Sequence, residues 1–228
     1  LLLEMDRDLD GKIPRLTQSD LEIGIDRANS WLLSHGITTI QEASPGNDIP
    51  RWLIIKGFKD SGKFNPRIGF MPGLVNLELF VEQGLSFGSG DEHLWIGHAK
   101  IMVTMTTGSM SPPENDLIAL VRRATENGFP AAIHAVEREV VVAASRAINE
   151  AGHLPVLNVP HRIEHLSESL ESDLSLVKQS GALVVSNPGF LYLSGDRYYS
   201  EIPRNRHDSL YRIGTLSRIG VPFAFGSD

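Results

Sequence analysis

The sequence contains no cysteine. Its absence excludes disulfide bonds, a thiol nucleophile and thiolate metal ligands, so that His, Asp, Glu and Lys are left to hold any metal ion. A block of basic residues is also missing, since 21 Lys and Arg are outnumbered by 28 Asp and Glu, for a formal net charge of −7. Neither nucleic acid nor an anionic membrane surface is therefore an expected partner.

Long hydrophobic runs are missing as well. The opening Leu1–Leu3 is followed at once by charged residues and is far too short for a signal peptide or a membrane span. We therefore expect no membrane partner. The absence of cysteine fits either side of a membrane, and we expect a cytoplasmic protein, with the formation of a homo-oligomer left open.

The remaining composition is that of an ordinary globular protein, with 41% apolar and 21% charged residues among 228. No low-complexity linker divides the chain, so we expect a single catalytic domain over residues 1–228. The chain starts without Met and stops at Asp228, directly after a strand-like run. We therefore expect this domain to be truncated at both ends.

Seven short apolar runs predict strands that are buried on both faces. They cover residues 38–41, 67–71, 95–103, 130–135, 161–165, 182–186 and 222–225. Amphipathic segments with helical spacing lie between them, at residues 20–33, 115–127, 137–151, 170–180 and 209–219, and each precedes a glycine: Gly36, Gly128, Gly152, Gly181 and Gly220. The first helix should pack on the sheet through the stripe Leu21, Ile25, Ala28, Trp31 and Leu32.

This alternation predicts an α/β protein with a parallel sheet, either closed as a (β/α)8 barrel or open and doubly wound. Periodicity alone does not choose between the two. A dinucleotide site has little support, because no G-x-G-x-x-G opens a helix after the first strand. Residues 189–206 show no clear period, and we expect them to form a substrate loop after a strand.

Polar side chains that suit metal binding lie at the ends of several predicted strands. Lys100 lies in the third run, His134 and His165 close the fourth and fifth, and Asp228 follows the seventh. Each has an ordinary structural explanation when taken alone, such as a solvated Lys or a helix N-cap for Asp228. Because parallel strand ends converge, their coincidence favours a shared metal site.

Five stretches, taken in order, resemble the amidohydrolase superfamily and within it the amidohydrolase-3 group, which includes N-substituted formamide deformylase-like enzymes. They are Leu33-Ser34-His35-Gly36-Ile37-Thr38-Thr39-Ile40, Gly97-His98-Ala99-Lys100-Ile101, Ala132-Ile133-His134-Ala135-Val136, Arg162-Ile163-Glu164-His165 and the segment 220–228. The resemblance implies a TIM (β/α)8-type metal-dependent hydrolase barrel. It would be incomplete in this chain, with about seven βα units.

The resemblance also implies roles for individual residues. In this family a lysine carboxylated by CO₂ bridges two metal ions, and it corresponds to Lys100. Two histidine ligands correspond to His134 and His165, and the aspartate that binds metal and shuttles the proton of the attacking water corresponds to Asp228. Glu164 would lie next to these ligands without binding the metal itself. The implied cofactor is a divalent metal, zinc first, as one or two ions.

Two features of the family are missing from this sequence. One is the His-x-His pair of the first barrel strand, since no His-x-His occurs here, and the other is the β-sandwich formed by the chain ends. The resemblance implies hydrolysis of a C–N bond in an amide-like or cyclic amide small molecule by metal-activated water. The alternatives are a deaminase or cyclic-imide hydrolase of the same superfamily, or a non-catalytic barrel that lost its first metal-binding motif.

Four residues near the expected mouth are candidate substrate contacts: Asn187, Arg197, Arg206 and Tyr211. For each of them, a solvated loop residue is an equally good explanation.

Overall fold

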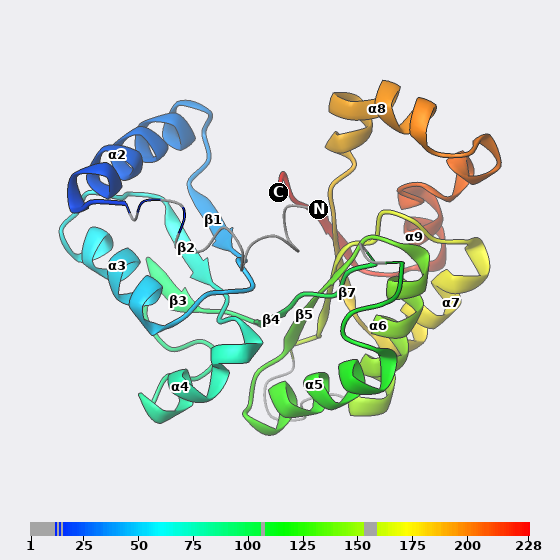
Figure 1. Ribbon diagram of the computed structural model, residues 1–228, viewed down its shortest axis with the longest axis horizontal. Helices are drawn as coiled ribbons and strands as arrows, with labels where there is room; N and C mark the ends of the chain where they lie inside the picture. Colours follow the sequence, from blue (N-terminus) through cyan, green and yellow to red (C-terminus); the bar gives the residue numbers. More distant parts are fainter. Residues whose placement is uncertain (1–11, 13, 15, 106–107, 153–158) are drawn as a thin grey trace. The chain divides into compact units, whose positions relative to one another are not determined.

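The computed structural model describes residues 12, 14, 16–105, 108–152 and 159–228. The chain divides into two compact units, residues 1–97 and 98–228, and each unit carries its own parallel sheet (Figure 1). Within the described residues, no helix has the length and apolarity that crossing a membrane requires.

The first unit contains a three-stranded sheet in the order β1-β2-β3, with β1 at Thr39–Glu42, β2 at Arg67–Phe70 and β3 at Leu94–Ile96. Its helices are α2 (Gln18–Ser34), α3 (Ile49–Asp60) and α4 (Leu77–Glu82), preceded by the 3-10 turn η1 (Leu74–Asn76). The core includes a row of aromatic rings in which Phe70 lies between Trp52 and Phe80, with centroid distances of 5.5 and 6.1 Å. This row joins β2 to α3 and α4.

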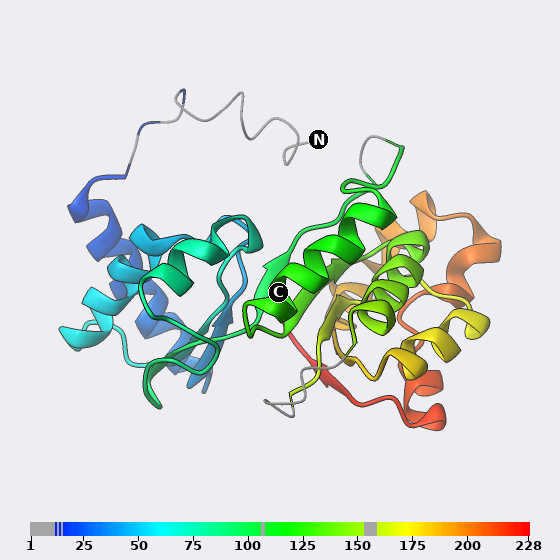
Figure 2. The same cartoon turned by 90° about the horizontal axis from the view of Figure 1, so that it is seen from below.

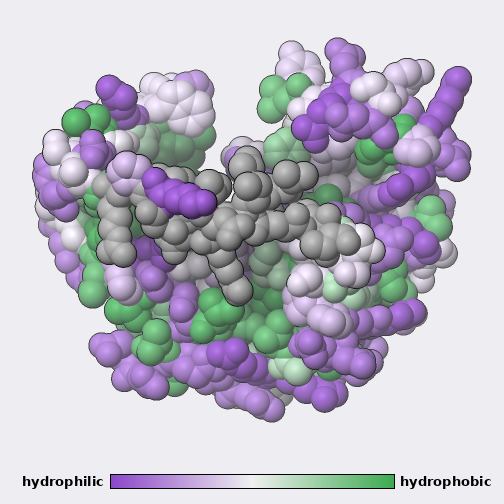
Figure 3. Space-filling view, viewed as in Figure 1, coloured by the Kyte–Doolittle hydropathy of each residue, from purple (hydrophilic) through white to green (hydrophobic). Residues whose placement is uncertain are grey.

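The helix α2 was expected to pack on the sheet through its apolar stripe, but it has no buried residue. Trp31 is 59% exposed, and the other stripe residues are only half-buried. A capping box fixes the start of the helix, since Thr17 and Asp20 exchange hydrogen bonds there. Several apolar side chains of η1 and α4 are also exposed, and Figure 3 shows apolar groups scattered among polar ones on the face that it draws.

The second unit contains a five-stranded parallel sheet in the order β4-β5-β6-β7-β8. Its strands are β4 (Ala99–Ile101), β5 (Ala131–Ala135), β6 (Arg162–His165), β7 (Leu183–Ser186) and β8 (Phe223–Phe225), and its helices are α5 (Glu114–Glu126), α6 (Arg138–Ala151), α7 (Glu171–Ser180), α8 (Gly189–Glu201) and α9 (Ile213–Ile219). The helices α5, α6 and α7 pack side by side along this sheet (Figures 1 and 2). One face of the sheet is apolar and fully buried, through residues such as Ile101, Ile133, Ile163 and Val184.

The prediction of an α/β fold of the TIM-barrel type, incomplete in this chain, is confirmed. Six of the seven predicted strands are present within one residue of their predicted ends, and the five glycines predicted to follow helices all have positive φ. The predicted strand 95–103 is wrong in one respect, because it is two strands in different sheets. The N–H of Gly97 donates to Phe70 O, whereas the N–H of Ala99 donates to Pro130 O, so the hydrogen-bonding partner changes between them.

Two further predictions were wrong for residues 189–219. The segment 189–206, expected as a loop, forms α8, which has non-helical backbone angles at Ser194, and then enters the 3-10 helix η2 (Arg204–Ser209). The helix expected to begin at Ser209 begins only at Ile213. The reason is local, since Tyr211 has a φ of 43°, which a right-handed helix does not allow.

Candidate active site

Four polar side chains occupy one face of the sheet in the second unit. In the register of the parallel strands, Lys100 lies opposite Ala132, and Ala132 lies opposite Arg162. In the next row of the same face, His134 lies opposite Glu164. Residues two apart on a strand project to the same face, as do paired residues of neighbouring strands. The strands β4, β5 and β6 therefore bring Lys100, His134, Arg162 and Glu164 onto the face opposite to the apolar one.

His165 reaches the same place by a break in the strand. It pairs with Ala135, so regular strand geometry would send its side chain to the apolar face. Its φ of 72° turns the side chain away from that course. The ring of His165 consequently lies edge-on to the ring of His134, with centroids 4.6 Å apart and planes at 69°.

Strained backbone is concentrated at this end of the sheet. Among the described residues, the non-glycine residues with positive φ are His165, Leu166, Tyr211 and Asp228. His165 is the last residue of β6 and Leu166 follows it, while Asp228 follows β8. The N–H of Tyr211 donates to Ser167 O, two residues after β6, at 2.8 Å. Residues held in such conformations cluster at functional sites, where the surrounding structure maintains them.

Burial controls the protonation of two of these groups. It lowers the pKa of His134 to about 3, and the nearby His165 and Lys100 act in the same direction. Burial also lowers the pKa of Lys100, against the opposing effect of the Glu164 carboxylate. His134 is therefore a neutral imidazole at pH 7, which is the form that binds metal ions.

Asp228 is the accessible group of the set. Its carboxylate lies 3.9 Å from His165 Nδ1, and its side chain is 53% exposed, whereas that of His165 is only 9% exposed. At this distance the two groups are neighbours without a direct hydrogen bond. Water and a small molecule can therefore reach Asp228 while the imidazole stays shielded.

The residues predicted to contact substrate occupy different surroundings. Asn187 is 4% exposed and bonded to His165 and Gly226. Arg197 pairs with Glu201 on α8, and Arg206 makes a two-pronged ion pair with Glu168. Burial raises the pKa of the Tyr211 hydroxyl, and the negative charge of Asp228 raises it further. Tyr211 is therefore linked electrostatically to Asp228.

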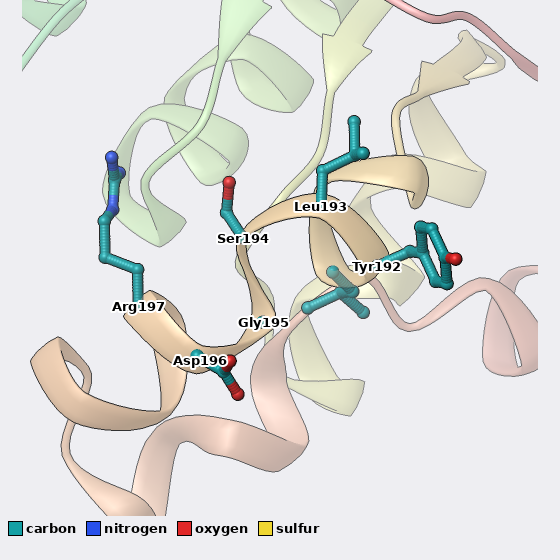
Figure 4. A pocket seen from close by; sticks show the side chains of 7 residues that line it. Tyr192, Leu193, Ser194, Gly195, Asp196 and Arg197 are labelled. Carbon is teal, nitrogen blue, oxygen red and sulfur yellow. The ribbon is translucent and has the colours of Figure 1, made fainter.

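A pocket of about 410 Å³ lies at the irregular turn of α8 (Figure 4). It is lined by residues 191–197, including the predicted substrate residue Arg197. In Figure 4 the side chains of Ser194 and Arg197 extend to the same side of the turn. The pocket takes its lining from α8 alone and includes neither imidazole, so it is separate from the polar face of the sheet.

The sequence reasoning did not single out Arg162, which is a central part of this face. Its guanidinium donates to Glu164 from Nε at 2.8 Å and from Nη2 at 3.0 Å. A signal was available, because two charged residues alternate with Ile163 inside an otherwise buried strand. His161, next to Arg162 in the sequence, accepts a hydrogen bond from Ala131 N at its Nδ1 and lies with Nε2 3.2 Å from Gly152 O.

The donor types on this face suit a divalent metal ion. Two imidazoles lie side by side, a carboxylate is close to one of them, and zinc accepts both kinds of ligand. Within the described residues, however, no three of His, Asp and Glu form a cluster compact enough to hold a metal. Lys100 is a ligand only if carboxylation gives it anionic oxygens, so a complete set of ligands would depend on it.

Comparisons with known proteins agree with the fold. A model of the amidohydrolase family matches residues 2–228. An uncharacterized metal-dependent hydrolase from Pyrococcus furiosus has a similar structure, with a TM-score of 0.80 and 22% identity over 99% of this chain and 50% of that chain. A second uncharacterized metal-dependent hydrolase, from Pyrococcus horikoshii OT3, gives a TM-score of 0.80 and 21% identity over 100% of this chain and 48% of that one.

A more distant similarity is to guanine deaminase from C. acetobutylicum, with a TM-score of 0.52 and 12% identity over 92% of this chain and 53% of that one. A search among curated proteins gave no match. The chain thus spans about half the length of the solved structures that it resembles.

Proposed function

Because the chain belongs to the amidohydrolase family, we propose that it forms part of a metal-dependent hydrolase that cleaves a C–N bond in an amide-like or cyclic amide small molecule. The observation that carries this proposal is the convergence of Lys100, His134, His165 and Asp228. Lys100, His134 and His165 lie in β4, β5 and β6, and Asp228 follows β8 of the same parallel sheet.

His134 and His165 would hold the metal ion as neutral imidazoles, with Asp228 and a carboxylated Lys100 as oxygen ligands. We take the ion to be zinc, since this mixture of nitrogen and carboxylate oxygen is one that zinc accepts. Such an ion activates water and polarises a carbonyl group.

Asp228 has the properties of a proton carrier. Its half-exposed carboxylate can accept the proton of the attacking water and pass it to the nitrogen that leaves. Tyr211 has a raised pKa, which keeps its hydroxyl protonated, and the charge of Asp228 contributes to this shift. The residue is 6% exposed and its hydroxyl lies 3.4 Å from that of Tyr198, so it would serve substrate only by leaving this partner. Arg197 and Arg206 would serve substrate only by leaving the carboxylates of Glu201 and Glu168.

The proposal is tested with the full protein loaded with zinc and with the variants His134→Ala and His165→Ala. We expect each variant to retain less zinc, measured by mass spectrometry of the dialysed protein, and to lose at least about 100-fold in hydrolysis of any active amide. His93→Ala is the control, because His93 is 63% exposed and lies in the other unit. Unchanged zinc content in both variants would contradict the ligand assignment.

A panel of N-acyl amines, cyclic imides and aminopurines identifies the class of reaction. Release of an amine or an opened ring supports hydrolysis of a C–N bond, whereas release of ammonia from an aminopurine would indicate a deaminase. A wild-type protein that retains no zinc after loading and dialysis, and that cleaves none of these compounds, would favour a non-catalytic barrel.

A further inference from the structure

The amide of Asn187 has an orientation that its neighbours dictate. Its Nδ2 lies 2.9 Å from Gly226 O, and its Oδ1 lies 2.7 Å from His165 Nδ1. A backbone carbonyl oxygen can only accept a hydrogen bond, so the amide NH₂ must face Gly226. The side-chain oxygen of Asn187 must consequently face His165.

This orientation decides where His165 carries its proton. The amide oxygen can only accept, so Nδ1 of His165 must carry a proton, and in the neutral form of the ring it carries the only one. The lone pair is then on Nε2. The hydrogen bond between Asn187 and His165 is shielded from water, since Asn187 is 4% exposed and His165 is 8% exposed.

From this geometry we infer that Asn187 is a positioning residue, which selects the tautomer of His165 that offers Nε2 to a metal ion. The inference rests on the proposed function for its metal, while the tautomer itself follows from the two hydrogen bonds. Partners that fix the second nitrogen of a histidine ligand orient the ring and strengthen its binding. Asn187 therefore supports the site without touching the substrate.

Asn187 also ties the histidine to the strand that precedes Asp228. Gly226 lies two residues before Asp228, and its own N–H donates to Ser186 O at 3.0 Å, next to Asn187 in the sequence. The approach is close, because a Cβ at position 226 would lie 3.2 Å from Asn187 Nδ2 and 3.4 Å from Val185 Cγ1. The same amide thus holds the end of β8 and the ring at the end of β6 in register.

The test uses the full protein, metal-free and labelled with ¹⁵N in its histidine rings. Two-bond ¹H–¹⁵N correlation spectra report which ring nitrogen is protonated, and His165→Gln identifies the signal of His165. We expect the Nδ1-protonated ring in the wild type and in Asn187→Asp, which keeps an accepting oxygen. Asp228→Ala, which removes the carboxylate 3.9 Å from Nδ1, should keep the Nδ1-protonated ring. In Asn187→Leu/Asp228→Ala, where neither acceptor is left, we expect the Nε2-protonated ring. In Asn187→Leu we expect an affinity for zinc about 10- to 100-fold lower than in the wild type, measured by competition with a chelator.

Asn47→Leu is the matched control. Asn47 is also buried, at 2% exposure, and its Nδ2 donates to the carbonyl of Met71. Both residues lie in the first unit, whereas Asn187 and His165 lie in the second. This variant should lose stability while the His165 signal and the zinc affinity stay unchanged. An Nε2-protonated His165 in the wild type or in Asp228→Ala, or an unchanged ring in Asn187→Leu/Asp228→Ala, would overturn the inference. Absence of zinc binding by a wild type with the expected tautomer would instead count against the proposed function.

Discussion

The guanidinium of Arg162 donates two hydrogen bonds to the carboxylate of Glu164 within the strand β6, from Nε at 2.8 Å and from Nη2 at 3.0 Å. Each of the two residues is 7% exposed. Lys100 lies on the same face of the sheet, and the charges of both residues affect its pKa. The pair therefore acts on the pKa of Lys100 in opposite directions, since Glu164 raises it and Arg162 lowers it.

Breaking this pair should be costly. In Glu164→Gln the buried guanidinium loses its charged partner, and we expect the free energy of unfolding in urea to fall by about 3–5 kcal/mol. The double variant Glu164→Gln/Arg162→Met should recover part of that loss, because no unbalanced charge remains from the pair.

The exposed pair of Lys56 and Asp60 provides the control, since its N–O distance of 2.6 Å is also short but its side chains are 48% and 63% exposed. Asp60→Asn should cost less than about 1 kcal/mol. If Glu164→Gln also lowered the free energy of unfolding by less than about 1 kcal/mol, water would have to reach the buried pair.

The stability of the metal-free protein should depend on pH through His98. Burial lowers the pKa of His98 to about 3, with the charge of Arg162 acting in the same direction, from an ordinary value of 6.5. Between these values the unfolded chain binds more protons than the folded one. The contribution of His98 is therefore complete above about pH 6.5 and is lost as the pH falls towards 3.

His134 should behave in the same way, because burial lowers its pKa to about 3 as well. Urea unfolding at pH 7.5, 6 and 5 measures the effect, with at most about 1.4 kcal/mol lost per pH unit and histidine. His98→Gln should reduce the slope of stability against pH, whereas His93→Gln, at an exposed position, should leave it unchanged. Equal slopes in His98→Gln and the wild type would contradict the role of buried neutral His98.

Much of the fold was predictable because its signals are local. Helix-ending glycines and apolar runs of strand length depend on a few neighbouring residues, and they placed β5, β6 and β7 within one residue of their ends. The helix α8, where a loop was expected, was missed for a related reason. No residue of this helix is buried, so its sequence has no apolar stripe to reveal it.

The candidate site was predictable in its residue types and less so in its connections. His134 and His165 were visible as histidines at strand ends, and the structure brings their rings together. The hydrogen bonds of Asn187 depend on the register of β6, β7 and β8, which joins residues 22 and 39 positions apart in the sequence. Such pairings across strands leave no local pattern, so Asn187 could be noticed but its role could not be predicted.

The last prediction concerns the chemistry of Lys100, which is 5% exposed. Burial lowers the pKa of its ammonium group and so increases the fraction of neutral amine, which is the form that attacks CO₂. Attack forms an N–C bond and releases a proton, and the side chain becomes an anionic carbamate. The cation of Arg162, close enough to lower the pKa of the lysine, would stabilise that anion.

We therefore expect a carbamate signal in the ¹³C NMR spectrum of the zinc-loaded full protein after addition of ¹³C-bicarbonate. Lys100→Arg should abolish the signal, because a guanidinium does not form a carbamate under these conditions, while Lys56→Arg should preserve it, since Lys56 is 48% exposed and paired with Asp60. A signal that survives in Lys100→Arg would place the carbamate elsewhere. Its absence from the zinc-loaded wild type would leave Lys100 as a buried amine and reduce the oxygen ligands of the site to Asp228.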